Sequence, residues 1–230
     1  MWRIIEDIFV KFPIIPLYGL TWVIGVYYFK KYFDTALKHF PLFIGYTFLT
    51  ELLGFLVKNY PEFTFFTDKR VDWHNIIIYN IYGFVIMFYF AWLYLQLLRS
   101  WKFKRVIKVG VGIYLVITVI SLFYKDPFHE VLIYPAVFES LIIVLAAFFH
   151  IKELRQLSDL PPQQYNLMFW VDLGLLVFHI PFPIIYFCAV HYYAEIYRPL
   201  HLHDVQNITI AAMYIIFIIG FIRSSRPSFR

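Results

Sequence analysis

The stretch AAMYIIFIIGF, residues Ala211 to Phe221, is apolar around its whole circumference when it is placed on a helix. A surface helix of a soluble protein needs a polar face, whereas a helix in lipid does not. Segments of this kind occupy residues 14–32, 41–58, 75–98, 106–124, 131–151, 166–190 and 205–223. A spanning helix needs roughly 20 mostly apolar residues, because only helices and closed barrels satisfy their own backbone in hydrocarbon. The sequence therefore predicts an all-α, polytopic membrane protein with seven transmembrane helices.

The composition supports a single transmembrane domain over residues 1–230. The chain is 61% hydrophobic and only 15% charged, which leaves too little polar surface for a soluble protein of this size. Apolar and polar residues alternate at helical spacing over residues 1–12, with Trp2 and Phe9 on one face and Asp7 and Lys11 on the other. This pattern indicates a helix lying in the membrane interface. A simple extension of the first span is the other interpretation.

Basic residues are divided unequally between the two sides of the predicted bundle. One side has seven: Arg3, Lys11, Lys58, Lys69, Arg70, Lys125 and Arg198. The other has thirteen: Lys30, Lys31, Lys38, Arg99, Lys102, Lys104, Arg105, Lys108, Lys152, Arg155, Arg223, Arg226 and Arg230. Because cytoplasmic loops carry the excess of Lys and Arg, we expect the N-terminus outside and the C-terminus inside. These residues sit against the bilayer, so lipid headgroups are expected partners and nucleic acid is not.

Two segments resemble each other closely enough to suggest an internal repeat. Asn75-Ile76-x-Ile78 opens the third span, and Asn207-Ile208-x-Ile210 opens the seventh. Two parallel repeats of three helices, joined by the fourth, would give a 3+1+3 arrangement. Because Ile, Leu and Phe dominate both halves, such matches also arise by chance.

Four polar residues within the spans are the predicted ligand-binding group: Glu51, Asn80, Glu139 and His179. Charged groups within a span are costly and normally face the bundle interior. At ~1.5 Å of rise per residue, all four lie about 10 Å below the outer surface. They would suit a proton, a metal cation or an amine. The alternative is that they are interhelical polar contacts without a ligand.

The sixth span carries two further signals. Pro181 and Pro183 lack N–H groups, so we expect a kink near His179 that frees the carbonyls of Val177 and His179. Asp172 lies one heptad before His179 and ~10 Å deeper, which makes it a possible relay residue or merely an interface residue.

Cofactor signals are weak or absent. His201, His203 and Asp204 could bind Zn or Cu outside the membrane, but surface histidines without a metal are the commoner interpretation. No lysine occurs between Asp204 and Ile222, which excludes a retinal linkage of the opsin type. Neither G-x-S-x-G nor H-E-x-x-H is present, so the common serine and zinc chemistries have no motif, and no cofactor is predicted.

The pattern Tyr79-Asn80-Ile81-Tyr82, Phe138-Glu139-Ser140, Phe169-Trp170, Asn207 and Gly220-Phe221 resembles a group of seven-helix bacterial membrane proteins of flavobacterial type. The resemblance covers the third to the seventh span. It implies a multi-pass protein of the bacterial inner membrane, but no activity, because none is established for the group. In that group a His often stands at the position of Asn80 and a Glu near Ile86, so this chain departs from the pattern there.

The sequence thus predicts an inner-membrane protein with an outward-facing polar pocket for a small ligand or ion, acting in transport or sensing. A sensor would need a cytoplasmic partner protein. An intramembrane enzyme acting on a lipid or isoprenoid, with Glu51, Glu139 and His179 as acid–base groups, is the alternative. A structural subunit of a larger assembly is a third interpretation.

Overall fold

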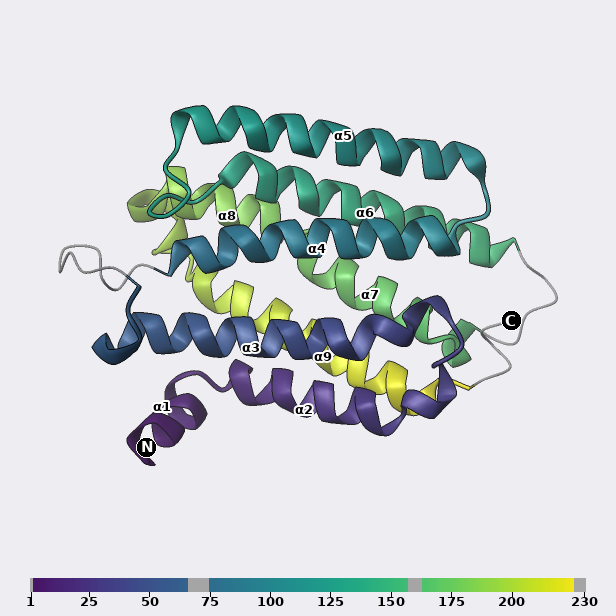
Figure 1. Cartoon of the computed structure of the whole chain (residues 1–230), viewed down its shortest axis with the longest axis horizontal. Helices are drawn as coiled ribbons and strands as arrows, with labels where there is room; N and C mark the ends of the chain where they lie inside the picture. The colour runs from purple at the N-terminus through teal and green to yellow at the C-terminus, as the bar shows by residue number, and fades with distance from the viewer. Residues whose placement is uncertain (1, 66–74, 157–162, 226–230) are drawn as a thin grey trace.

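The computed structural model of the chain describes residues 2–65, 75–156 and 163–225, and every regular element within these ranges is helical (Figure 1). The α-helices are α1 (Trp2–Lys11), α2 (Ile14–Tyr27), α3 (Phe40–Asn59), α4 (Ile76–Leu97), α5 (Trp101–Tyr124), α6 (Ile133–Arg155), α7 (Leu167–His179), α8 (Phe182–His191) and α9 (Leu202–Arg223). Short 3₁₀ helices lie at Phe29–Lys31, Ala36–His39, Pro61–Phe63 and Gln163–Tyr165, and a π-helical turn at Tyr193–Tyr197.

Six helical segments of the described chain are long and apolar enough to cross a membrane. They are Ala36–Asn59, Ile76–Leu97, Trp101–Tyr124, Ile133–Arg155, Leu167–His191 and Leu202–Arg223. The prediction of a polytopic helical membrane protein is therefore confirmed. The first predicted span, residues 14–32, is less regular, because α2 ends at Tyr27 and is followed by the 3₁₀ helix Phe29–Lys31. It becomes a seventh candidate only together with α1, to which it is bent by 92°.

Polar side chains lie at the start of α5 and at the end of α2. The helix predicted at residues 106–124 begins earlier, at Trp101, although Lys102, Lys104 and Arg105 lie in its first turns. Long basic side chains can extend toward headgroups from within a helix, so they do not end it. At the end of α2, the Tyr32 hydroxyl turns back and donates to the Gly25 carbonyl, which fixes the turn that follows the helix.

The sixth span is interrupted where the prolines predict it. Helix α7 ends at His179 and α8 begins at Phe182. The Ile184 and Ile185 amides both donate to the Pro181 carbonyl, at 3.1 and 3.0 Å. Among the described residues, no backbone N–H donates to the carbonyls of Val177 or His179, as expected from Pro181 and Pro183.

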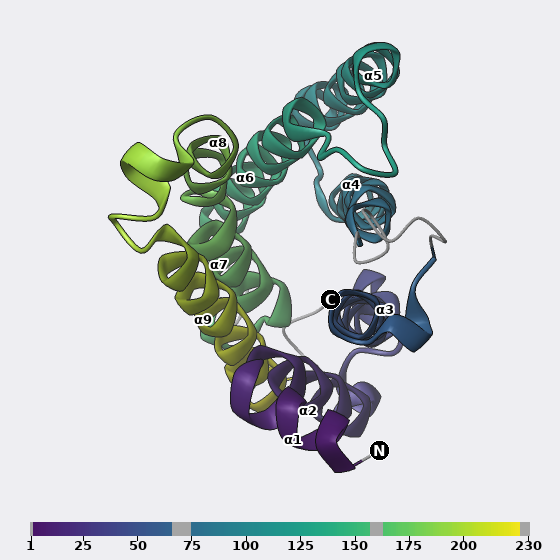
Figure 2. The same cartoon turned by 90° about the vertical axis from the view of Figure 1, so that its left-hand side faces the viewer.

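The helices run side by side along the long axis of the molecule, with α1 turned aside at the N-terminus (Figure 1). Seen along this axis, α2, α3, α4, α6, α7 and α9 surround the interior, while α5 and α8 pack outside α6 (Figure 2). Aromatic side chains fill much of this interior, among them Phe40 against Phe217 and Phe43 against Tyr89, with ring centroids 5.2 and 4.3 Å apart. The predicted parallel repeat is not tested by this arrangement and stays a prediction.

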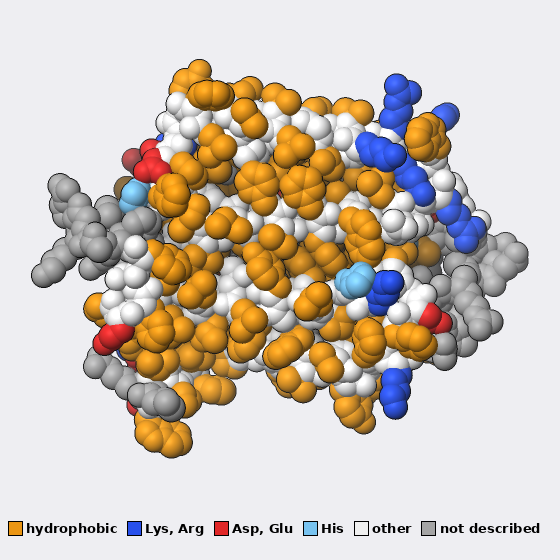
Figure 3. Space-filling view, in the orientation of Figure 1, with side chains coloured by type: hydrophobic (Ala, Val, Ile, Leu, Met, Phe, Trp, Pro, Cys, Tyr) orange, Lys and Arg blue, Asp and Glu red, His pale blue; other side chains and the backbone are white. Residues whose placement is uncertain are grey.

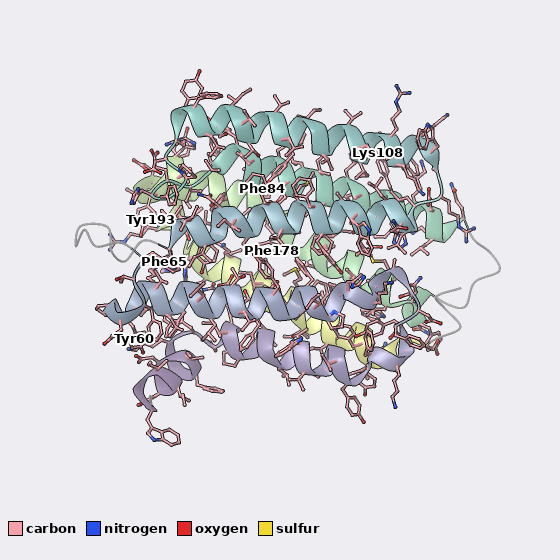
Figure 4. The ribbon with its side chains drawn as sticks, in the orientation of Figure 1. Tyr60, Phe65, Phe84, Lys108, Phe178 and Tyr193 are labelled. Carbon is pink, nitrogen blue, oxygen red and sulfur yellow. The ribbon has the colours of Figure 1, made fainter. Side chains whose placement is uncertain are left out.

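The surface is apolar along the middle and charged at both ends, with Lys and Arg gathered at one of them (Figure 3). We call this the basic end; α2, α4, α6 and α9 finish there, and α3, α5 and α7 begin there. Lys108 of α5 lies toward it, whereas Tyr60, Phe65 and Tyr193 lie at the opposite end (Figure 4). Of the basic residues counted from the sequence, Lys69, Arg70, Arg226 and Arg230 lie outside the described residues.

Candidate functional site

The four predicted ligand residues all lie in the half of the bundle opposite the basic end. Glu51 belongs to α3, Asn80 to α4, Glu139 to α6, and His179 ends α7. Glu139 and His179 are buried, with 5% and 4% of their surface exposed, whereas Glu51 and Asn80 are half-buried. Among the described residues, no hydrogen bond joins either glutamate to His179 or Asn80. We expected a direct or water-bridged contact between a carboxylate and one of these two residues, and the described residues show no direct hydrogen bond of this kind.

Asn80 holds the loop between α5 and α6 in place. Its Nδ2 donates to the carbonyls of Pro127 and Glu130, at 2.7 and 3.0 Å, and its Oδ1 accepts from the Leu132 amide at 3.2 Å. Both ends of the amide are thus engaged by backbone groups of this loop. The geometry gives Asn80 an anchoring role, because an unpaired loop carbonyl or amide at this depth would cost free energy.

His179 contacts Ser140 across the α6–α7 interface. The distance between Ser140 Oγ and His179 Nδ1 is 2.9 Å, and both side chains are buried. Ser140 directly follows Glu139, so His179 does lie at the predicted level of the bundle. The hydroxyl, however, takes the place that was predicted for a carboxylate.

Glu51 belongs to a group of tyrosines that the sequence alone did not bring together. The Tyr79 hydroxyl donates to Glu51 Oε2 at 3.3 Å, and the Thr47 and Tyr82 hydroxyls are 2.9 Å apart. Two more tyrosines complete the group, Tyr18 from α2 and Tyr214 from α9, with ring centroids 4.5 Å apart. The Tyr214 hydroxyl faces Thr47 and Tyr82.

We call Tyr18, Thr47, Glu51, Tyr79, Tyr82, Glu139 and Tyr214 the tyrosine–glutamate cluster. Its members come from α2, α3, α4, α6 and α9. Glycines make the close approach of these helices possible. A Cβ on Gly54 would lie 2.5 Å from the Tyr79 hydroxyl, and one on Gly83 would lie 3.2 Å from Glu139 Oε2.

The buried Glu139 carboxylate has no described partner for its negative charge. Among the described residues, its carboxylate accepts no hydrogen bond and pairs with no cation. It lies within electrostatic reach of the hydroxyls of Tyr82, Tyr114 and Tyr186. Buried polar groups in proteins are almost always paired, so an unpaired buried carboxylate indicates either a bound proton or a bound partner.

A second polar group lies near the basic end, around Asp172 of α7. The Tyr94 hydroxyl donates to Asp172 Oδ1 at 2.8 Å, and His150 Nδ1 lies 2.5 Å from Asp172 Oδ2. All three side chains are buried. We call Tyr94, His150 and Asp172 the Tyr–His–Asp cluster. The sequence singled out Asp172, but not its partners from α4 and α6.

His150 was missed because it stands just before Lys152, where the span meets the headgroups. A signal for it does exist in the sequence. His150 follows Glu139 by three helical turns, about 11 residues, and so lies on the same face of α6. Because Glu139 and His150 share one face of α6, the prediction that Glu139 faces the bundle interior applies to His150 as well.

The external histidines lie apart from both clusters. His201 Nδ1 and His203 Nδ1 are each 3.6 Å from the Asp204 carboxylate, and all three side chains are exposed. Within the described parts of the chain, no three His, Cys, Asp or Glu side chains are grouped so that they could hold a metal ion. His201, His203 and Asp204 remain a prediction without support from geometry.

Comparisons with protein-family models, with curated proteins and with solved structures found no match for this chain.

Proposed function

We propose that the protein is a multi-pass bacterial inner-membrane protein that binds a small organic cation, such as a protonated amine, in the tyrosine–glutamate cluster and acts in transport or sensing. The observation that carries this proposal is the Glu139 carboxylate, which is buried without a donor or a cation among the described residues. Glu51, bonded by one tyrosine hydroxyl, provides a second negative group in the same cluster.

Energetics favour a cation at this position. An isolated ionised carboxylate in a low-dielectric interior costs several kcal/mol, and a positive ligand within a few ångströms offsets much of this cost. Tyrosine faces attract organic cations through their ring quadrupoles, by about 0.5–2 kcal/mol each. Two carboxylates surrounded by tyrosines therefore match an amine better than an anion or a neutral sugar.

The proposed topology has seven transmembrane segments, the first formed by α2 with the 3₁₀ helix after it, although α2 alone is shorter than the other spans; α1 lies in the interface and the basic end in the cytoplasm. It rests on the excess of Lys and Arg at that end (Figure 3). The tyrosine–glutamate cluster then lies in the outer half of the membrane. A reporter fused after Arg230 should be cytoplasmic, and one inserted between Lys125 and His129 should be external; the reverse result would refute the orientation.

One hollow on the surface gives no support to the alternative of an enzyme acting on a lipid. A shallow hollow of about 430 Å³ lies along α4 and is lined by Phe84, Val85, Phe88, Tyr89 and Trp92. Its lining brings neither a carboxylate nor an imidazole to the lipid, and acid–base chemistry on a lipid substrate needs such a group within reach.

Cation binding can be measured on the purified protein in lipid nanodiscs. Thermal unfolding is followed with methylammonium, tetramethylammonium, Na⁺ and Zn²⁺, because a ligand at 100 times its Kd stabilises the folded state by about 2.7 kcal/mol. We expect an organic cation to raise Tm in the wild type and in Glu195→Gln, whose carboxylate is exposed at the same end. The shift should be lost in Glu139→Gln and reduced in Glu51→Gln.

Glutamine keeps the shape of glutamate and removes a buried charge, so the variants are expected to fold. An unchanged Tm shift in Glu139→Gln would refute the proposed site. No response to any organic cation would refute the ligand class.

A further inference from the structure

The Tyr–His–Asp cluster is a second polar centre, separate from the tyrosine–glutamate cluster. Tyr94 lies three residues, and His150 and Asp172 five residues, from the ends of α4, α6 and α7 at the basic end, about 4–8 Å along each helix. Asp172 is completely buried and His150 is 5% exposed. Water at the basic end is therefore separated from this cluster by only a short stretch of protein.

One ring nitrogen of the Tyr–His–Asp cluster makes no hydrogen bond with the described residues. Both oxygens of Asp172 are engaged, one by the Tyr94 hydroxyl and the other by His150 Nδ1. The second ring nitrogen of His150, Nε2, has no hydrogen-bond partner among the described residues. A carboxylate at Nδ1 fixes the tautomer and the orientation of the ring and leaves Nε2 with its lone pair free to accept a proton.

Neighbouring charged side chains at this end are engaged elsewhere. The Glu153 carboxylate accepts the backbone amides of Arg99 and Ser100, at 2.7 and 2.8 Å. The Lys152 ammonium lies 5.7 Å from the Phe103 ring, and the Lys31 ammonium donates to the Ile222 carbonyl at 2.9 Å. Among the described residues, the titratable groups that face His150 are therefore Asp172 and Tyr94.

Two helices carry members of both polar centres. Helix α4 contributes Tyr79, Tyr82 and Tyr94, and α6 contributes Glu139 and His150, while α7 carries Asp172 beside them. A shift of α6 against α4 and α7 would alter both centres together. Binding at one centre can therefore change affinity at the other, by a reciprocal coupling free energy.

We propose that the Tyr–His–Asp cluster is a proton-binding site, and that its proton is exchanged for the organic cation bound at the tyrosine–glutamate cluster. The proton passes from water at the basic end to His150 Nε2, and the imidazolium formed is held by the Asp172 carboxylate. Proton binding stands on this geometry alone, whereas the exchange rests on the proposed function. The proposed activity is a proton-coupled antiport of a small organic cation.

Proton binding can be tested on the wild-type protein without any ligand. Deuterium exchange at the imidazole carbon between the two nitrogens follows the protonation state of each histidine, and mass spectrometry resolves it peptide by peptide. In nanodiscs, the exchange rate at His150 should depend on pH in the wild type, because Nε2 binds a proton. This dependence should differ in Asp172→Asn, which lacks the carboxylate that holds the imidazolium. A rate at His150 that does not change with pH, or an identical profile in Asp172→Asn, would overturn the proton site.

The exchange can be tested in proteoliposomes with radiolabelled tetramethylammonium, which has no N–H and so cannot cross the bilayer as a neutral amine. We expect an imposed pH gradient to drive at least tenfold accumulation by the wild type and by His191→Gln, which alters an exposed histidine at the opposite end. His150→Gln should keep tetramethylammonium counterflow and lose the response to the gradient. Glu139→Gln should lose both.

These outcomes separate the two proposals. If His150 binds a proton as described but tetramethylammonium is neither bound nor counterflowed by the wild type, the cation site is wrong and the proton site stands. If His150→Gln accumulates tetramethylammonium under the gradient as the wild type does, the proton exchange at this cluster is wrong and the cation site stands.

Discussion

Replacement of Gly54 by alanine tests the geometry of the tyrosine–glutamate cluster directly. The new Cβ would lie 2.5 Å from the Tyr79 hydroxyl oxygen and 3.0 Å from Cζ of the same ring. Helix α3 cannot easily move away at this point, because the Gly54 carbonyl accepts a 2.8 Å hydrogen bond from Asn75 Nδ2. The Tyr79 ring must therefore swing aside, which breaks its hydrogen bond to Glu51.

The magnitude follows from three contributions. Overpacking of a buried contact costs about 1–3 kcal/mol, and loss of the Tyr79–Glu51 hydrogen bond costs about 1 kcal/mol more. Within a helix alanine is more favourable than glycine by about 0.5–1 kcal/mol, which offsets part of this destabilisation. Gly54→Ala should therefore destabilise the protein by about 1–3 kcal/mol. A Tm decrease of about 2–4 °C per kcal/mol is expected for a chain of this length.

Gly112→Ala is the matched control, because no atom lies within 4 Å of a Cβ at this position on α5. It should be neutral or stabilising, by up to about 1 kcal/mol. A double-mutant cycle with Tyr79→Phe isolates the contact, since phenylalanine removes the atom that clashes. In Tyr79→Phe, the cost of Gly54→Ala should fall by about 1 kcal/mol or more. Equal stabilities of Gly54→Ala and Gly112→Ala, or strict additivity in the cycle, would refute this packing.

Three further predictions concern the ends of the bundle. Asn80→Leu removes three hydrogen bonds to the α5–α6 loop and should cost about 1–3 kcal/mol, with faster amide exchange in that loop. The His129 hydrogen bond holds the pKa of the Asp126 carboxyl below its usual range, so the ionised carboxylate stabilises the loop above about pH 4, and this stabilisation is lost as the pH falls through the lowered pKa. In Asp126→Asn, amide exchange in the loop should no longer show this pH dependence, and a pH profile identical to that of the wild type would contradict the prediction. Lys31→Met removes a donor from the carbonyls of Phe221 and Ile222 at the end of α9, so Tm should fall by about 1–4 °C, whereas an unchanged Tm would argue against that capping.

The sequence was sufficient to predict the helices, because apolar runs of spanning length have few alternatives in lipid. Pro181 and Pro183 likewise marked the interruption after His179, since a missing N–H acts locally. The first span was less predictable. Its 14-residue helix is followed by a 3₁₀ helix and a hydrogen bond from the Tyr32 hydroxyl back to the Gly25 carbonyl, and hydropathy alone does not indicate this contact.

The candidate site was predicted at the right level of the bundle but with the wrong contacts. Consecutive residues on a helix point about 100° apart, so depth alone does not say which of two neighbours faces a given partner. Glu139 was expected near His179, yet Ser140 makes that contact and Glu139 faces Gly83 of α4. The rotation of each helix about its axis is set by packing of the whole bundle, which one sequence does not specify.

The tyrosines were underestimated for a related reason. Tyrosines in a span normally pack and bond to a neighbouring backbone, so Tyr82 was not among the predicted ligand residues. Its importance depends on Thr47 and Tyr214, from helices far away in sequence. His150 shows the same limit, because only its position opposite Asp172 distinguishes it from an ordinary histidine at a membrane surface.

The apolar layer between the two polar centres determines what kind of transport is compatible with this fold. The side chains of Met87, Phe90, Ile143, Leu175 and Phe217 are almost fully buried and belong to one continuous core. They lie along α4, α6, α7 and α9 between the level of Glu139 and that of Asp172. An ion crossing such a layer without compensation would meet a desolvation barrier of several kcal/mol. A permanently open channel does not fit this packing, so the proposed transport requires that the helices shift and this layer separate, as in an alternating-access mechanism.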